Sequence, residues 1–121
     1  MPVVIKAHTA DILFMSRVRV IWPSVPFVVA IRNPVEVIAS NLALPADWVK
    51  TMLAHYGENN VFGLTGPETR RTTAEEYCAR EVGMFLGAAN AQIDDKCQVL
   101  DFARMTLGNI YRVAKAHTPH R

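Results

Sequence analysis

The stretch FVVAIRNPVEVIASNL, from Phe27 to Leu42, joins an apolar strand pattern to an apolar helix pattern. Five consecutive apolar residues, Phe27 to Ile31, follow Pro26 without polar alternation. A continuous apolar run of this length is typical of a parallel strand that is covered on both faces. The stretch therefore predicts a buried parallel strand that leads directly into a helix.

Three local signals mark the start of that helix. Asn33 is a favourable N-cap residue, and Pro34 fits the first helical position because its missing N–H has no helical partner there. Glu36 falls in the first turn, where the helix dipole favours a negative charge. Apolar residues at helical spacing continue until Pro45, which ends the predicted helix.

Strand and helix patterns alternate along the rest of the chain, which predicts an α/β fold with a small parallel sheet. Residues 57–72, rich in Gly, Asn and Thr, are expected to form a loop or lid within a single domain that covers residues 1–121. The other expected strands are Pro2–Ile5 and Cys97–Phe102, and the other expected helices are Asp11–Ile21 (capped by Thr9 or Asp11), Ala46–Tyr56, Thr72–Gln92 (with Thr72 and Glu75 at capping-box spacing) and Thr106–His117.

The composition excludes several classes of function. The chain has 121 residues, of which 50% are hydrophobic and 20% charged, as in one soluble globular domain. The net charge is only +2 and no basic run is dense enough to follow a nucleic-acid backbone. No apolar run is long enough to cross a bilayer and the N-terminus lacks the layout of a signal peptide, so we expect a cytoplasmic protein without a membrane partner. Cys78 and Cys97 match no metal-ligand spacing, so we expect buried thiols and no metal.

The position of Arg32 indicates a ligand site. A strand that ends in Arg32 and turns at once into a helix places the guanidinium at the carboxyl edge of the sheet, where open α/β sheets bind ligands. The planar fork of Arg suits a phosphate, and Ser40, eight residues further on, offers a hydroxyl as a second donor. The alternative is that Arg32 pairs with a carboxylate such as Glu36 and that Ser40 has only a packing role.

The segment RNPVEVIAS, from Arg32 to Ser40, resembles the 3′-phosphate-binding segment of the sulfotransferase family. The resemblance implies that Arg32 and Ser40 bind the 3′-phosphate of the co-substrate 3′-phosphoadenosine 5′-phosphosulfate. Upstream, VVIKAHTAD is similar to the family's strand ending in Lys-Thr-His, with Ala7 in place of Thr. This match implies that Lys6 stabilises the transferring sulfuryl group and that His8 is the general base on the acceptor, a role that the pKa of histidine suits.

The resemblance is specific from Arg32 to Ser40 and extends clearly over Val3 to Leu44. It implies a P-loop-type three-layer fold in which a small parallel sheet of about three strands is flanked by helices. The family's 5′-phosphosulfate-binding loop would precede the first strand, so we expect a partial sulfotransferase-like domain. Near the other end, QVLDFARM occupies the place of the family's Tyr-Glu-Asp-Leu segment but retains only its hydrophobic shape, with Phe102 at the Tyr position.

Three functional interpretations remain open. The first is an enzyme that transfers a sulfuryl group from 3′-phosphoadenosine 5′-phosphosulfate to a hydroxyl or amine of a small molecule or glycan, releasing adenosine 3′,5′-bisphosphate. The second is a non-catalytic α/β chain that binds an adenine nucleotide or forms a homodimer through an exposed sheet edge. The third is an unrelated small α/β domain in which RNPVEVIAS is only a strand-to-helix turn; that turn requires Asn33 and Pro34 but gives no reason for Ser40.

Overall fold

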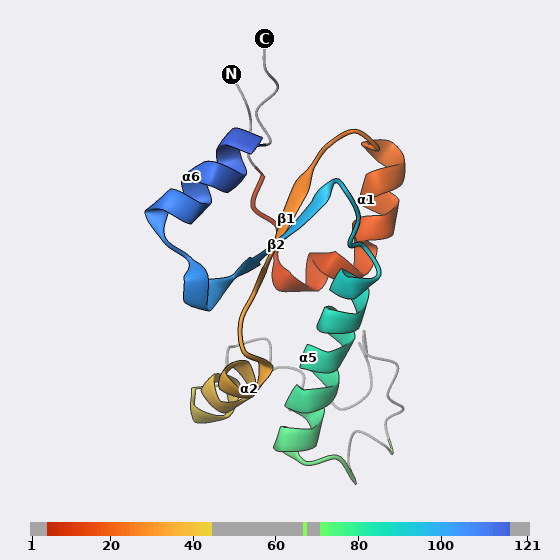
Figure 1. The fold of residues 1–121 in the computed structure, drawn as a ribbon. Helices are drawn as coiled ribbons and strands as arrows, with labels where there is room; N and C mark the ends of the chain where they lie inside the picture. The colour runs from red at the N-terminus through yellow and green to blue at the C-terminus, as the bar shows by residue number, and fades with distance from the viewer. Residues whose placement is uncertain (1–4, 45–66, 68–70, 117–121) are drawn as a thin grey trace. The chain divides into compact units, whose positions relative to one another are not determined.

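The computed structural model describes residues 5–44, 67 and 71–116. The described part is a mixed α/β structure with a two-stranded parallel sheet (Figure 1). The chain divides into two compact units, Met1–Arg32 with Gly87–Arg121 and Asn33–Leu86. In chain order the elements are η1 (Thr9–Phe14), α1 (Met15–Ile21), β1 (Phe27–Ile31), α2 (Pro34–Ala43), α5 (Ala74–Asn90), β2 (Cys97–Asp101), η2 (Phe102–Arg104) and α6 (Leu107–Ala116).

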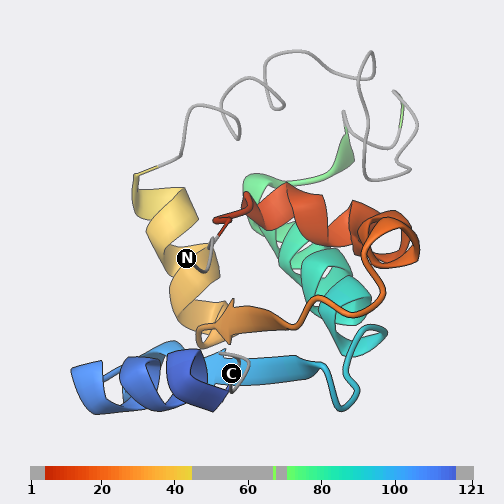
Figure 2. The same ribbon diagram turned by 90° about the horizontal axis from the view of Figure 1, so that it is seen from above.

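The sheet of the first unit pairs β1 with β2. Its register runs from Phe27 opposite Cys97 to Ile31 opposite Asp101, so the two strands end at the same edge. Figures 1 and 2 show the strands side by side, with α1 near their amino ends and α6 beyond their carboxyl ends. The sequence prediction of a parallel α/β arrangement is confirmed. The third predicted strand, Pro2–Ile5, lies outside the described residues except for Ile5, which is not in a strand.

The prediction that β1 is covered on both faces is wrong. Phe27, Val29 and Ile31 are half-buried, whereas the alternating residues Val28 and Ala30 are exposed, and Val28 retains 41% of its accessible surface. Folded proteins expose much apolar surface, so an uninterrupted apolar run does not require two covering layers. The strand therefore has one covered and one open face.

The helix boundaries agree with the predictions to within a few residues, but the caps differ. The segment before Pro23 is split into η1 and α1. His8 is the N-cap residue of η1, and the His8 N–H donates to Asp11 Oδ2 at 2.6 Å.

The capping box of α5 consists of Thr73 and Glu76, one residue later than predicted. Glu76 N–H donates to Thr73 Oγ1 at 3.2 Å, and Thr73 N–H donates to Glu76 Oε2 at 3.1 Å. Thr72 with Glu75 and Thr73 with Glu76 both have the spacing of this motif, so the sequence leaves its register open. The predicted helix Ala46–Tyr56 lies outside the described residues, as does almost all of the loop at residues 57–72.

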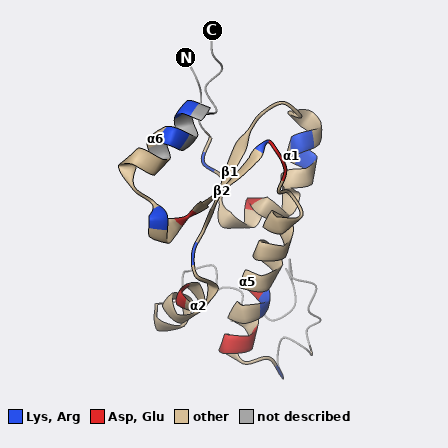
Figure 3. Cartoon of the chain, viewed as in Figure 1, with Lys and Arg blue, Asp and Glu red and all other residues tan. Residues whose placement is uncertain are grey.

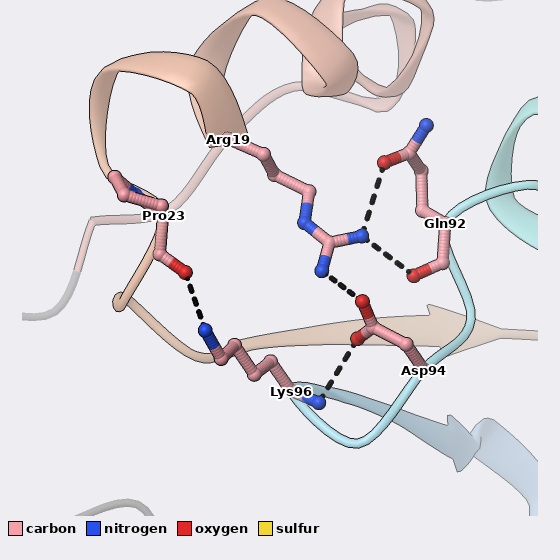
Figure 4. A network of polar contacts seen from close by, with 5 residues as sticks. All are labelled: Arg19, Pro23, Gln92, Asp94 and Lys96. Atoms are coloured by element: carbon pink, nitrogen blue, oxygen red, sulfur yellow. Dashed lines mark hydrogen bonds and ion pairs between the residues drawn. The ribbon is translucent and has the colours of Figure 1, made fainter.

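A polar network fastens the amino ends of the two strands together (Figure 4). The Arg19 guanidinium on α1 donates to Gln92 O at 3.1 Å and to Gln92 Oε1 at 3.3 Å, and it also forms an ion pair with Asp94. Lys96 Nζ donates to Pro23 O at 2.8 Å, and Lys96 N–H donates to Asp94 Oδ1 at 2.9 Å. The turn before β1 and the turn before β2 are therefore joined through Arg19 and Lys96.

We expect Arg19→Met to destabilise the chain more than Arg17→Met. Arg19 lies 5.1 Å from the centroid of the Phe27 ring, and Met retains much of its apolar stem while removing the donors to Gln92. Each lost hydrogen bond of this kind costs about 1 kcal/mol. Arg17, on the same helix, is exposed and lies over the Phe14 ring at 5.9 Å. Urea unfolding of both variants tests the prediction, and an equal loss of unfolding free energy in the two would contradict it.

Candidate anion-binding edge of the sheet

The junction between β1 and α2 has the local structure that the sequence predicts. β1 ends at Ile31, Arg32 follows, and Asn33 is the N-cap residue of α2, with its Oδ1 accepting from Val35 N–H at 3.0 Å. Pro34 occupies the first helical turn together with Glu36. The structure thus confirms the predicted strand and the predicted helix with its Asn33 cap. Arg32 stands between them and leaves the sheet at its carboxyl edge.

The same edge receives a second residue from β2. Since Ile31 and Asp101 are register partners in a parallel pair, the residues that follow them, Arg32 and Phe102, leave adjacent strands at the same level. The Arg32 guanidinium carbon lies over the Phe102 ring, 5.5 Å from its centroid. This distance is within the range of a cation–π interaction. The structure therefore joins two residues that are 70 positions apart in the sequence.

Both partners are open to solvent. Arg32 is exposed, and Phe102 retains 53% of its accessible surface. The edge formed by Arg32 and Phe102 is therefore accessible to a ligand in solution.

Ser40 lies in the second unit, on α2, and its side chain is exposed. Its backbone carbonyl accepts from Leu44 N–H at 2.9 Å, which closes the last turn of the helix. Arg32 belongs to the first unit and Ser40 to the second. The spacing of eight residues that suggested a shared phosphate remains a sequence-based prediction.

Lys6 and His8 lie in the segment that leads into η1, within the same unit as Arg32. Both side chains are exposed. The backbone of His8 is held by Asp11, whose N–H donates to His8 O at 3.0 Å while its carboxylate accepts from His8 N–H. The pair of reciprocal contacts fixes the backbone at His8 and leaves the imidazole available to solvent.

Charged residues are interspersed rather than gathered. Figure 3 shows basic residues on α1, α5 and α6 and around the sheet, and acidic residues on α2 and α5 and around the sheet. Among the residues that the structure describes, no group of three His, Cys, Asp or Glu side chains is placed to hold a metal ion. No helix in the described ranges is long and apolar enough to span a membrane.

A second group of ionisable side chains, which the sequence reasoning missed, lies on α5. Tyr77, Cys78, Glu81 and Val82 are all buried and share one helical face, since they follow the spacing of a single stripe. Glu81 retains only 1% of its accessible surface, and neither carboxyl oxygen has a hydrogen-bond partner within the described structure. Burial raises the pKa of Glu81 to about 7. Burial also raises the pKa of the Cys78 thiol, with a further contribution from the negative charge of Glu81.

Both cysteines are free thiols and buried, which confirms that prediction. Burial, together with the charge of Asp94, raises the pKa of Cys97, while Arg19 opposes that shift. A raised pKa keeps a thiol protonated and unreactive. Neither cysteine therefore has the environment of a nucleophile.

Comparison of this chain with known protein families, with characterised proteins and with solved structures finds no match. Any function must consequently be argued from the residues themselves and from the edge formed by Arg32 and Phe102.

Proposed function

We propose that this chain is a sulfotransferase-like protein in which Arg32 binds the 3′-phosphate of 3′-phosphoadenosine 5′-phosphosulfate. The observation that supports the proposal best is the placement of Arg32 directly after β1 and directly before the Asn33 cap of α2. A phosphate is recognised well by the planar donors of Arg and by backbone N–H groups at a helix start. Ser40 would add a hydroxyl donor to the same phosphate.

The proposed reaction transfers a sulfuryl group to a hydroxyl or amine. The acceptor oxygen or nitrogen forms a bond to sulfur, and the bond between sulfur and the bridging phosphate oxygen breaks. The electron pair of that bond leaves with adenosine 3′,5′-bisphosphate, and the proton of the acceptor passes to the imidazole of His8. Lys6 would stabilise the negative charge that develops on the sulfuryl and bridging oxygens. The exposure of both side chains is compatible with access by substrate.

Calorimetric titration with adenosine 3′,5′-bisphosphate tests the binding step. We expect saturable binding to the wild-type chain, and a folded chain that does not bind would contradict the proposal. A second assay then asks whether the chain transfers a sulfuryl group to simple alcohols, phenols or amines, with His8→Ala as the variant that should lose transfer but retain binding. Binding without transfer would favour the non-catalytic nucleotide-binding alternative.

A further inference from the structure

The helix α6 and the turn before it carry positive charge only, unlike the mixed charge of the rest of the chain. Residues 102–116 contain three of the thirteen Lys and Arg residues, Arg104, Arg112 and Lys115, and none of the eleven Asp and Glu residues. All three basic side chains are exposed, and within the described part of the chain none of them forms an ion pair with a carboxylate. Figure 3 shows basic residues and no acidic ones on α6. This segment therefore presents one sign of charge to solvent.

Exposed apolar side chains lie on the same helix. Leu107 retains 87% of its accessible surface and Tyr111 retains 68%. Leu107, Tyr111 and Lys115 are each four positions apart, so they follow one line along the helix surface. In Figures 1 and 2, α6 lies at the carboxyl ends of the strands, away from α1. The helix thus combines an exposed apolar line with basic side chains beside it.

The start of α6 is held by local hydrogen bonds. Asn109 N–H donates to Thr106 Oγ1 at 3.2 Å, and Asn109 Nδ2 donates to Arg104 O at 2.5 Å. Arg112 donates in turn to Asn109 Oδ1 at 2.8 Å. These contacts join η2 to the first turns of α6. The exposed apolar and basic side chains are therefore carried by a helix with a defined start.

We propose that α6 binds the surface of an anionic membrane. Leu107 and Tyr111 enter the boundary between headgroups and acyl chains, while Arg112 and Lys115 contact the anionic headgroups. Tyrosine suits this depth because its ring is apolar and its hydroxyl is polar. A fluid lipid surface accepts the convex side of a helix without a matching groove, whereas a protein partner needs such a groove.

This inference goes beyond the sequence-based expectation of no membrane partner. That expectation rests on the absence of an apolar run long enough to cross a bilayer. A helix that lies in the plane of the interface needs no such run, because it buries only one face. The inference is also independent of the proposed function, since no residue of α6 takes part in the proposed nucleotide site.

Sedimentation with lipid vesicles tests the inference. The wild-type chain is mixed with vesicles of phosphatidylcholine alone and with vesicles that also contain about one third phosphatidylserine. We expect binding to the anionic vesicles that weakens with added salt, and much weaker binding to the neutral ones. Absence of binding to the anionic vesicles, or equal binding to both kinds, would overturn the inference.

Substitutions on α6 and α1 locate the binding surface. Lys115→Gln should weaken binding to the anionic vesicles about fivefold, and Leu107→Gln should weaken it about five- to tenfold. The matched controls are Arg17→Gln and Ile21→Gln on α1, in the same unit, where Arg17 is exposed and Ile21 retains 64% of its accessible surface. The controls should bind within about twofold of the wild type. Equal losses from the two helices would overturn the inference.

Both α6 substitutions replace exposed side chains, and Gln forms helices nearly as well as Leu and Lys. The circular dichroism of the variants should therefore match that of the wild type. If Leu107→Gln loses helix, the comparison of Lys115→Gln with Arg17→Gln still decides the question. A chain that binds polyglutamate but not the anionic vesicles would contradict the lipid assignment and indicate an acidic protein partner.

Discussion

Raising the pH from about 4.5 to about 8 should destabilise the wild-type chain by about 3 kcal/mol more than it destabilises Glu81→Gln. Glu81 is buried on α5 without a hydrogen-bond partner in the described structure, and burial raises its pKa from 4.5 to about 7. A buried carboxyl group prefers its neutral form because the apolar surroundings do not solvate the charge. Gln has a similar shape and remains neutral over this range of pH.

The direction follows from proton binding in the two states. Between about pH 4.5 and 7 the folded chain retains the Glu81 proton, whereas the unfolded chain releases it, so the free energy of unfolding falls as the pH rises. The stabilisation that the protonated Glu81 provides is fully present below the pKa of this group in the unfolded chain. It is lost as the pH rises through the pKa of Glu81 in the folded chain. The pH dependence that Asp94 contributes has the opposite sign. The hydrogen bond from Arg19 lowers the pKa of Asp94 below 3.8, so the stabilisation by its ionised form is lost as the pH falls through that lowered pKa.

Urea unfolding at several pH values measures this difference directly. Glu75→Gln is a suitable control, because Glu75 is exposed in the first turn of the same helix. The control should retain the pH dependence of the wild type, and Glu81→Gln should show a flatter profile. If the profile of Glu81→Gln parallels that of the wild type, Glu81 does not keep its proton in the folded chain.

Arg32→Ala should weaken binding of adenosine 3′,5′-bisphosphate by about 30- to 100-fold. The estimate corresponds to the loss of about 2 to 3 kcal/mol from charged hydrogen bonds to a phosphate. The Ala substitution removes the guanidinium at the carboxyl edge of the sheet without touching the Asn33 cap or the strand register. Calorimetry of the wild type and the variant at one salt concentration gives the affinity ratio.

Arg17→Ala provides the matched control for this experiment. Arg17 is also exposed and also lies over a phenylalanine ring, that of Phe14, but it is on α1 near the opposite end of the strands (Figure 1). Both variants lose one positive charge, so a purely electrostatic attraction would weaken similarly in the two. Equal losses of affinity would therefore argue against a specific role for Arg32.

The sequence predicts the elements around the candidate site well, because their signals are local. Five apolar residues specify β1, and Asn33 with Pro34 specifies the start of α2 within one residue. The cap of α5 was harder to place, since Thr72 and Thr73 precede two glutamates and offer the same motif in two registers. The open face of β1 was also missed, because hydrophobicity alone does not reveal how many layers cover a strand.

Two features of the structure, the Arg32–Phe102 contact and the burial of Glu81, do not follow from the sequence pattern, and each has a physical reason. The contact of Arg32 with Phe102 depends on β1 and β2 being neighbours in a particular register, which is a non-local property. Once those strands are assumed to pair, their exit residues become the natural candidates for contact. Glu81 was missed because a lone acidic residue on a helix is normally assigned to solvent, although Tyr77, Cys78 and Val82 on the same stripe indicate a buried face.

The central claim is that Arg32 recognises a 3′-phosphate, and the most direct test is a comparison of two nucleotides. The wild-type chain and Arg32→Ala are each titrated with adenosine 3′,5′-bisphosphate and with adenosine 5′-monophosphate, which lacks only the 3′-phosphate. We predict that the wild-type chain prefers the bisphosphate and that Arg32→Ala loses this preference. Equal affinity of the wild-type chain for the two nucleotides, or a preference that persists in Arg32→Ala, would contradict the claim.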